Sequence, residues 1–199
     1  SFGTATASYT FYKNKLFSPK LWVHCAISTF IGALLGAFAV YLVSGEFLEK
    51  ILPILIIATA IYTLFKKSPP STTCLKKSKP CKVKQWFQGL TIGFYDGFAG
   101  PGAGAFWTVS GQILYKIDIL LSSGVARAMN FISNFTALIT FVILGQVDYL
   151  IGVTMGVCLM IGSVIGAKAA IRFGSSFIRP IFIFVVLCIS VKLAWSAWL

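Results

Sequence analysis

The sequence predicts an all-α, polytopic membrane protein made of two repeats, with a helix broken by glycine and proline opening the second repeat. Three observations predict this fold. Of the 199 residues, 57% are hydrophobic and 11% are charged, whereas a soluble domain carries about 25% charged residues. Apolar runs of roughly 20 residues, the length of a membrane-spanning helix, recur along the chain. The stretch Gly93–Trp107 is equally apolar, but its glycines and Pro101 disfavour one continuous helix.

The apolar runs divide the chain into membrane segments joined by polar turns. Small residues near the start of the chain, and Gly32 and Gly36 in the next run, allow helices to pack closely. We assign residues 1–65 to the remainder of a first repeat, 66–85 to a basic linker and 86–199 to a second repeat. The expected segments are the end of a membrane helix at 1–12, spans at 21–43, 48–65, 120–144, 149–170 and 178–198, and the broken segment at 86–115.

Positive charge dominates the polar turns. The chain carries 17 Lys and Arg against five Asp and Glu, a net charge of +12. In a soluble protein this balance would indicate nucleic-acid binding, but the cytoplasmic loops of membrane proteins collect lysine and arginine. We therefore expect a multi-pass protein of the inner (plasma) membrane, with the lipid bilayer as its surroundings, the linker 66–84 in the cytoplasm and no nucleic acid bound. A homo-oligomer is compatible with this expectation.

No group of residues in the sequence has the spacing of a catalytic or metal centre. Cys74 and Cys81 lack a standard zinc spacing, and the chain has a single histidine. The stretch around Pro101 lacks the Gly-Lys-Ser/Thr of a phosphate-binding loop. We expect no enzyme activity, no metal and no cofactor. The cysteines are expected to be free thiols in the basic loop (Cys74, Cys81) or small packing residues in apolar runs (Cys25, Cys158, Cys188).

The chain contains an internal repeat with a shift of 130 residues. Two copies of one unit suit a transporter fold. The glycine-rich stretch opens the second copy, and by the same shift its counterpart should lie about 45 residues before Ser1. We therefore expect the chain to be truncated at its N-terminus and to have lost the first copy of this motif. The matched positions include Thr6 with Thr136, Ala7 with Ala137, Thr10 with Thr140, Gly32 with Gly162 and Gly36 with Gly166.

The loop charges favour one threading of the broken segment. If 86–115 crosses the membrane once, the basic turn at 168–179 lies opposite the basic loops 13–20 and 66–84. If 86–115 enters and returns as two half-helices, all three basic stretches share one side and an acidic excess lies on the other. The returning threading obeys the positive-inside rule better, and it makes the two copies inverted, a common transporter symmetry.

The break in the glycine-rich segment is a candidate anion site. Proline is tolerated at the first position of a helix, so Pro101 can begin the second half-helix. Gly102 and Gly104 then offer backbone N–H groups at a helix end that carries partial positive charge. Gly97 and Gly100 line the other side of the break. The alternative interpretation is a glycine-lined crossing of two packed helices without a ligand.

Asp96 is the one acid deep inside an apolar segment. An ionisable group in hydrocarbon is costly and is usually functional. Asp96 is therefore a candidate for proton or ion coupling. The alternative is a structural role, in which the carboxylate binds backbone groups freed by the break.

The helix after the break carries several polar residues. Arg127, Asn130, Asn134 and Thr136 recur along it, and the first three share one face. They are candidates to line a polar path, with Arg127 attracting anions, and Thr4 falls where Asn134 does in the repeat. The alternative is hydrogen bonding between helices, together with an arginine that extends toward the membrane interface.

These residues resemble a known family. The segment 89–107, GLTIGFYDGFAGPGAGAFW, resembles the signature of the sulfite exporter TauE/SafE family, in particular its YfcA-like members. ARAMNFISN at 126–134 is similar to the family segment that comes after this signature, and SFGT at 1–4 matches the corresponding region of the first half. The resemblance implies a duplicated half with about eight membrane segments, and movement of sulfur-containing anions such as sulfite, sulfonates or thiosulfate.

The expected function is therefore secondary transport of small anions. No nucleotide-binding motif is present in the sequence, so an ion gradient is the expected energy source. A passive anion channel would need no coupling carboxylate, and a non-transporting membrane subunit would need no complete site. A membrane enzyme would need paired acid–base or nucleophilic residues in the spans, which the sequence lacks.

Overall fold

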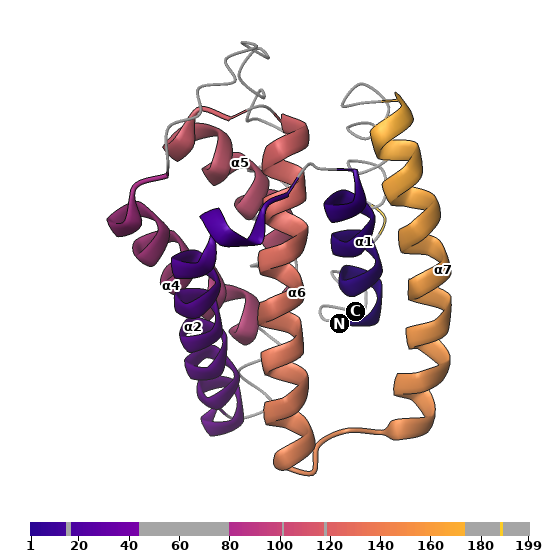
Figure 1. The fold of residues 1–199 in the computed structure, drawn as a ribbon. Helices are drawn as coiled ribbons and strands as arrows, with labels where there is room; N and C mark the ends of the chain where they lie inside the picture. Colours follow the sequence, from indigo (N-terminus) through magenta and orange to yellow (C-terminus); the bar gives the residue numbers. More distant parts are fainter. Residues whose placement is uncertain (15–16, 44–79, 101, 118, 174–187, 189–199) are drawn as a thin grey trace.

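Every element in the described part of the chain is helical. The computed structural model describes residues 1–14, 17–43, 80–100, 102–117, 119–173 and 188. The predicted spans 48–65 and 178–198, apart from residue 188, and the linker up to residue 79 lie outside these residues. The elements are α1 (Phe2–Lys13), the short 3-10 helix η1 (Pro19–Leu21), α2 (Val23–Leu42), α4 (Lys82–Phe98), α5 (Ala103–Tyr115), α6 (Ile119–Ile143) and α7 (Tyr149–Phe173), arranged as in Figure 1.

Three of the described helices are long and apolar enough to cross a membrane. They are Val23–Leu42, Leu121–Ile143 and Tyr149–Ala169. These segments match the predicted spans 21–43 and 120–144, and the span that starts at 149, because continuous apolar runs specify both the helix and its membrane environment. For the described residues, the prediction of an all-α fold with apolar helices long enough to span a membrane is confirmed.

Helices α4 and α5 are shorter and run antiparallel to each other. Lys84 Nζ donates to the carbonyl of Leu114 over 3.4 Å, and Tyr115 Oη donates to Gln88 Oε1 over 2.9 Å. Gln88 Nε2 also donates to Ser110 Oγ over 2.6 Å. The start of α4 therefore lies beside the end of α5, and the chain reverses direction between the two helices.

Helix α4 begins four residues earlier than the sequence suggested. Its first residue is Lys82, inside the stretch assigned to the linker. The amide of Gln85 explains this start, because Gln85 Oε1 accepts from Cys25 N over 3.1 Å and its Nε2 donates to the carbonyl of Leu21 over 3.1 Å. The charged first turn of α4 is thus held against the start of α2.

Helices α2 and α4 pack backbone to backbone. A Cβ built on Gly32 of α2 would lie 2.5 Å from the carbonyl oxygen of Leu90, and one built on Gly93 of α4 would lie 2.7 Å from that of Thr29. No real Cβ fits at such distances, so glycine permits the contact. The predicted packing face of the 21–43 segment is confirmed, since Gly32, Ala33, Gly36 and Ala37 are all buried.

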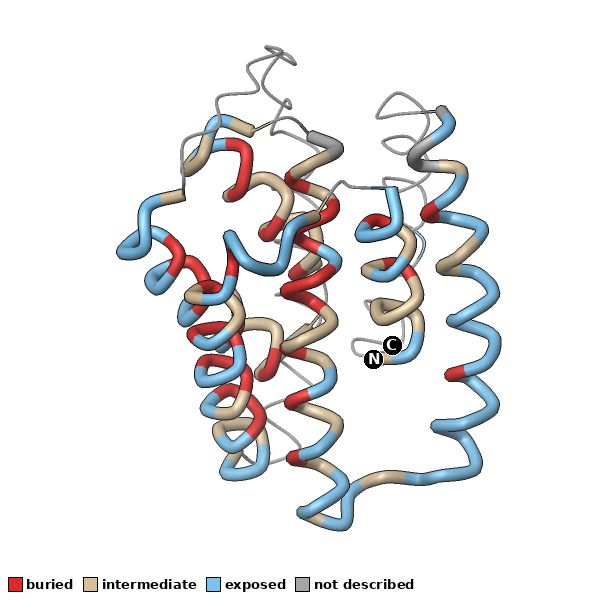
Figure 2. Tube along the Cα trace, viewed as in Figure 1, coloured by how far each residue is buried: buried red, intermediate tan, exposed pale blue. Residues whose placement is uncertain are grey.

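Helix α6 lies at the centre of the described bundle. It packs against α1, α2, α4 and α5, whereas α7 packs against α1. Figure 2 shows buried residues along α6, and exposed residues along most of α7. The largest buried apolar cluster joins α2, α5 and α6 through Trp22, Cys25, Ala103, Trp107, Val125, Ala126, Ala128 and Met129.

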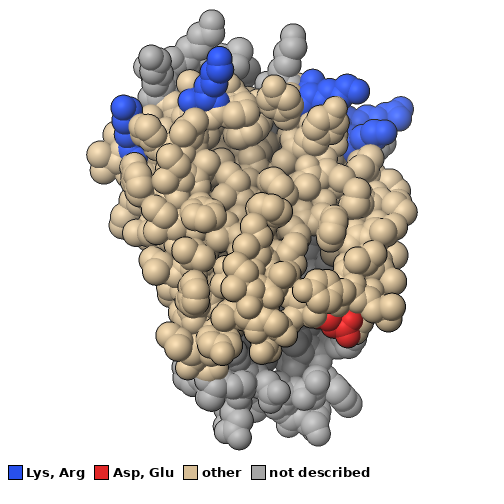
Figure 3. Space-filling view, turned by 60° about the horizontal axis from the view of Figure 1, so that its bottom comes forward, with Lys and Arg blue, Asp and Glu red and all other residues tan. Residues whose placement is uncertain are grey.

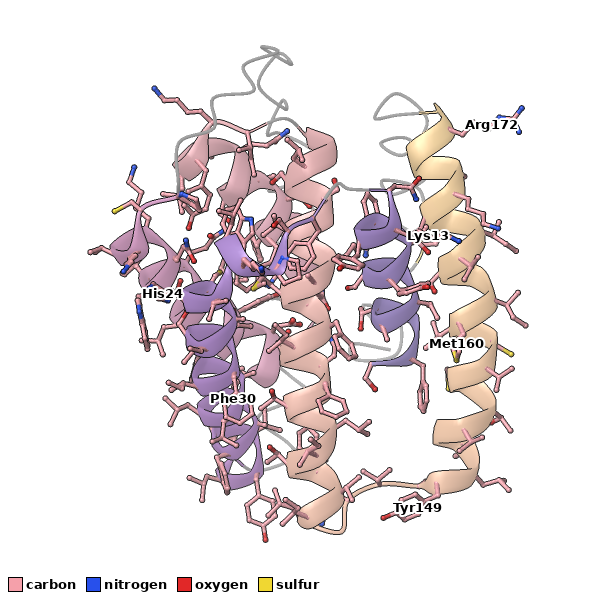
Figure 4. The ribbon with its side chains drawn as sticks, in the orientation of Figure 1. Lys13, His24, Phe30, Tyr149, Met160 and Arg172 are labelled. Atoms are coloured by element: carbon pink, nitrogen blue, oxygen red, sulfur yellow. The ribbon has the colours of Figure 1, made fainter. Side chains whose placement is uncertain are left out.

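Positive charge collects at one end of the bundle. Lysine and arginine side chains gather at one end of the face shown in Figure 3, and acidic atoms lie toward the other end. Figure 4 places Lys13 and Arg172 toward one end and Tyr149 at the opposite end. At the start of α4, Cys81 is an exposed free thiol, as predicted. The backbone N–H groups of Lys84 and Val83 lower the pKa of this thiol.

The close contact between α2 and α4 predicts that Gly93→Ala is destabilising. The added methyl meets the backbone of Thr29, so the helices must separate, at a cost of about 1–3 kcal/mol. Thermal unfolding in detergent, monitored by circular dichroism, measures the loss. Gly152→Ala on α7 is the matched control, because nothing described lies within 4 Å of its built Cβ, and alanine favours a helix. Equal melting temperatures of the two variants would contradict the packing argument.

Candidate functional site

Two glycines between α4 and α5 have a left-handed backbone conformation. Gly100 has φ +77° and Gly102 has φ +80°, a region that glycine adopts without strain. Gly100 N donates to the carbonyl of Tyr95 over 3.2 Å and so closes α4. Gly102 is the N-cap of α5, and its carbonyl accepts from Ala105 N over 2.9 Å. Pro101, which was expected to begin the second half-helix, lies outside the described residues.

The first turn of α5 faces two hydrogen-bond donors from α6. A Cβ built on Gly104 would lie 3.4 Å from Asn130 Nδ2 and 3.8 Å from Arg127 Nη1. Asn130 is buried and Arg127 is exposed. A group the size of a methyl therefore fits at Gly104 in ordinary contact with these donors. The structure therefore brings together three of the residues that the sequence singled out.

Asn134 orients Asn130. Its Nδ2 donates to Asn130 Oδ1, and also to the carbonyl of Asn130 over 2.7 Å. Because Asn130 Oδ1 is engaged as an acceptor, its Nδ2 is the atom left to face Gly104. Asn134 thus acts on the site through Asn130, one turn earlier on the same face of α6.

Asp96 is bound by α6 on the other side of the break. Ser133 Oγ donates to Asp96 Oδ2, and Ser133 is fully buried. A serine hydroxyl can donate to a carboxylate or accept from a protonated one, so the contact is compatible with both protonation states. Within the described residues Asp96 and Arg127 form no ion pair. The guanidinium charge of Arg127 is therefore not neutralised by this carboxylate.

Three other candidates lie away from the Gly104 cluster. Gly97 is buried in the contact between α4 and α2, where a Cβ would meet the backbone of Ala33. Gly97 therefore contributes to the packing of α4 against α2. Thr4 donates to the carbonyl of Ser1 over 2.9 Å within α1, and no described contact links it to Gly104. Thr136, also considered as path-lining, is buried and donates to the carbonyl of Ile132.

Sequence reasoning missed the residues that position the break. Ser133 lies between Asn130 and Asn134 in the sequence and was not singled out. Its spacing of three residues from Asn130 places it near the same face of the helix and could have identified it. Gln88, Ser110 and Tyr115 join the outer ends of α4 and α5. These partners are separated by more than 20 residues, so no local pattern could pair them. In the described residues no group of three or more His, Cys, Asp or Glu side chains could hold a metal ion.

The chain matches one known protein family and several individual proteins. The family described as "Sulfite exporter TauE/SafE" matches residues 1–193. The chain is 29% identical over 192 residues to "Probable membrane transporter protein ORF9" of Sinorhizobium sp, covering 96% of this chain and 73% of that protein. It is 28% identical over 195 residues to "Probable membrane transporter protein YfcA" of Escherichia coli strain K12, covering 98% and 72%.

A third relative is also similar to the chain over almost its whole length. The chain is 26% identical over 198 residues to "Probable membrane transporter protein" of Haemophilus influenzae, covering 98% of this chain and 76% of that protein. No solved structure matches the chain. The three relatives are therefore similar to this chain over nearly its whole length, and each is longer than the matched region.

The contact between Asp96 and Ser133 predicts strong energetic coupling. In a double-mutant cycle with Asp96→Ala, Ser133→Ala and the double variant, we expect a coupling energy of about 1.5–3 kcal/mol, the range for a hydrogen bond to a charged group. The measurement is thermal or denaturant unfolding in detergent. Each single variant is the reference for the double variant, so the cycle needs no separate control. Additive effects of the two substitutions would show that the bond does not contribute to stability.

Proposed function

The chain belongs to the sulfite exporter TauE/SafE family, and we propose that it is a secondary transporter of small anions, in particular sulfur oxyanions such as sulfite, sulfonates or thiosulfate. The observation that carries this proposal is the meeting of Gly104, Asn130 and Arg127 at the start of α5. The relatives named as probable membrane transporters support the transporter class. The anion itself is inferred from the chemistry of the site and from the family description.

The donors around Gly104 suit an oxyanion. A guanidinium group presents parallel N–H donors that match the oxygens of sulfite or a sulfonate. The amide of Asn130 adds a neutral donor, and the N-terminus of α5 adds partial positive charge. Because Gly104 carries no side chain, an oxygen can approach the helix backbone directly. These three contributions all stabilise negative charge at one position.

The proposed transporter is built from two inverted repeats. The 130-residue shift pairs α1 with the second half of α6, and α2 with α7. The packing agrees with this pairing, since α2 packs against α6 and α7 packs against α1. In Figure 1 α1 and α6 run in opposite directions, as do α2 and α7. In this proposal α4 and α5 form the glycine- and proline-broken hairpin of the second repeat, a common position for transporter substrates.

The basic end of the bundle is proposed to face the cytoplasm. The end of α1, the start of α4 and the end of α7 carry lysine or arginine. The turn between α6 and α7 carries Asp148. Under the positive-inside rule this distribution of charge supports a cytoplasmic location for the lysine-rich linker, with the protein in the inner membrane.

Asp96 is proposed to couple transport to a proton or cation. It lies in the last turn of α4, on the opposite side of the break from Gly104. Its bond to Ser133 attaches it to α6, the helix that also carries Asn130 and Arg127. Protonation of Asp96 and anion binding near Gly104 therefore act on one helix, so each is expected to alter the other.

The anion site predicts that Arg127→Gln and Gly104→Ala reduce uptake without unfolding the protein. Loss of one charged hydrogen-bond donor costs about 1.5–3 kcal/mol, which corresponds to about a tenfold to hundredfold rise in KM. The methyl group of Gly104→Ala would lie at ordinary contact distance from Asn130 and Arg127, so it occupies the anion space without a clash. The measurement is uptake of sulfite, thiosulfate, sulfonates and sulfate into proteoliposomes.

Two matched variants control this experiment. Lys13→Gln removes an exposed positive charge at the end of α1, and Gly152→Ala adds a methyl group to an open position of α7. Both should leave KM within about twofold, because they lie outside the proposed site and surface charges act weakly on distant groups. Equal KM values for all four variants would reject the anion site at Gly104.

The proposed coupling role predicts that Asp96→Asn abolishes the dependence of uptake on a gradient. Asparagine keeps a hydrogen-bonding partner for Ser133 but carries no titratable proton. Uptake is measured with and without a pH gradient, and exchange of labelled anion across the membrane tests whether the pathway itself survives. If uptake by Asp96→Asn still depends on the gradient, Asp96 has no coupling role. If flux through the unaltered protein does not depend on a gradient, the protein is a passive channel.

A further inference from the structure

The indole N–H of Trp107 is buried without a hydrogen-bond partner in the described part of the chain. Trp107 is 1% exposed, and it lies in α5 three residues after Gly104. A donor that has left water and found no acceptor is costly, and the cost is largest where lipid surrounds the bundle. Such a group in a folded protein indicates a partner from outside the chain, such as an ion or a water molecule.

Helix geometry directs the side chain of Trp107 toward the candidate anion site. Long side chains of a helix extend back over the preceding turn, where they cover the residues three and four positions earlier. For Trp107 these residues are Gly104 and Ala103. Ala103 is itself 1% exposed and belongs to the same buried cluster as Trp107. The indole therefore lies over the first turn of α5, where Gly104 has no side chain.

Helix α6 borders the same indole. Ala126 and Met129 belong to its buried cluster, and each is next in the sequence to a residue that faces Gly104. These neighbours are Arg127 and Asn130, whose Nη1 and Nδ2 lie 3.8 Å and 3.4 Å from a Cβ built on Gly104. The indole, the guanidinium and the amide thus approach one turn of α5 from two helices.

Two other buried polar atoms lack a partner among the described residues, and they lie elsewhere. Ser8 Oγ belongs to α1. Gln112 Oε1 belongs to α5 but lies five residues after Trp107, which places its side chain about 140° around the helix. Trp107 is the one of these three residues whose side chain covers Gly104.

The three groups around Gly104 all donate hydrogen bonds. An indole N–H and a guanidinium accept none, and Asn130 Oδ1 already accepts from Asn134. An oxyanion whose oxygens carry no proton can accept from all three groups. An anion with an O–H must direct that hydrogen at a donor, which leaves both groups unpaired. The set therefore favours sulfonates, thiosulfate and sulfate over hydrogen phosphate and hydrogen carbonate.

We propose that Trp107 Nε1–H is the third side-chain donor of the anion site at Gly104, and that this donor-only set selects oxyanions that carry no proton. The inference rests on the proposed anion transport and deepens it. It names the residue that completes the site and the chemical property that separates its ligands from other small anions.

Indole NMR signals test the contact directly. In the protein with isotope-labelled tryptophan in nanodiscs, the signal that Trp107→Phe removes should shift and saturate as thiosulfate is added. The signal of Trp86, which is 43% exposed at the start of α4, is the control and should stay in place. Arg127→Gln should raise the thiosulfate concentration needed for half of the shift by about tenfold or more, because it removes a charged donor.

Equilibrium dialysis with labelled anions separates the possible failures. If thiosulfate binds but the Trp107 signal does not shift, the donor role is overturned and the site at Gly104 remains. If neither thiosulfate nor methanesulfonate binds, the proposed transporter is rejected and the donor role with it.

Benzothienylalanine in place of Trp107 removes the N–H but keeps the shape of the side chain, since sulfur replaces the indole nitrogen. We expect the KM for thiosulfate uptake to rise about tenfold to hundredfold, with kcat unchanged. The melting temperature should not fall, because the N–H has no partner among the described residues without the anion. The same replacement at Trp86 is the matched control. An unchanged KM, or a rise that accompanies a lower melting temperature, would overturn the donor role.

Competition measures the selectivity. At neutral pH, hydrogen phosphate should displace labelled thiosulfate about tenfold more weakly than methanesulfonate does, because a site of buried donors rejects a ligand that leaves them unpaired. Displacement by phosphate at the same concentration as methanesulfonate would overturn the donor-only assignment.

Discussion

The backbone contact between α2 and α4 is the constraint on which the described structure depends. In a bilayer the helices gain little from the hydrophobic effect when they associate, so close van der Waals packing must hold them. Glycines on both helices allow the backbones to touch, with Gly32 against Leu90 and Gly93 against Thr29. One whole face of α4 is used in this contact. Asp96, in the last turn of α4, binds Ser133 of α6.

This constraint explains why the break lies beside α6. Helix α4 ends at Phe98 and α5 begins at Ala103, so the ends of two short helices meet inside the bundle. Unpaired backbone groups and a carboxylate in such a place require polar partners. Helix α6 supplies the partner of the carboxylate, because Ser133 binds Asp96. On the same helix, Asn130 and Arg127 lie near Gly104 and form the candidate anion site.

The polar residues of α6 show which parts of the candidate site the sequence predicts. Their helical spacing predicted a shared face for Arg127, Asn130 and Asn134, and the structure places the first two at Gly104. The spacing did not predict that Asn134 acts through Asn130, or that Gly97 belongs to the contact with α2. Glycine serves both as a packing residue and as a space for a ligand. Only the neighbouring helix distinguishes the two uses.

The sequence by itself determined the class of the protein, the position of its apolar helices and the excess of positive charge in its turns. These properties depend on runs of neighbouring residues, because hydropathy, helix breaking and charge act over short stretches. The tertiary structure alone decided that Ser133 binds Asp96, that Gln88 joins Ser110 to Tyr115 and that Arg127 faces the first turn of α5. Each of these contacts joins residues more than 20 positions apart, and the distance between such residues is set by how the helices pack and not by their order in the chain.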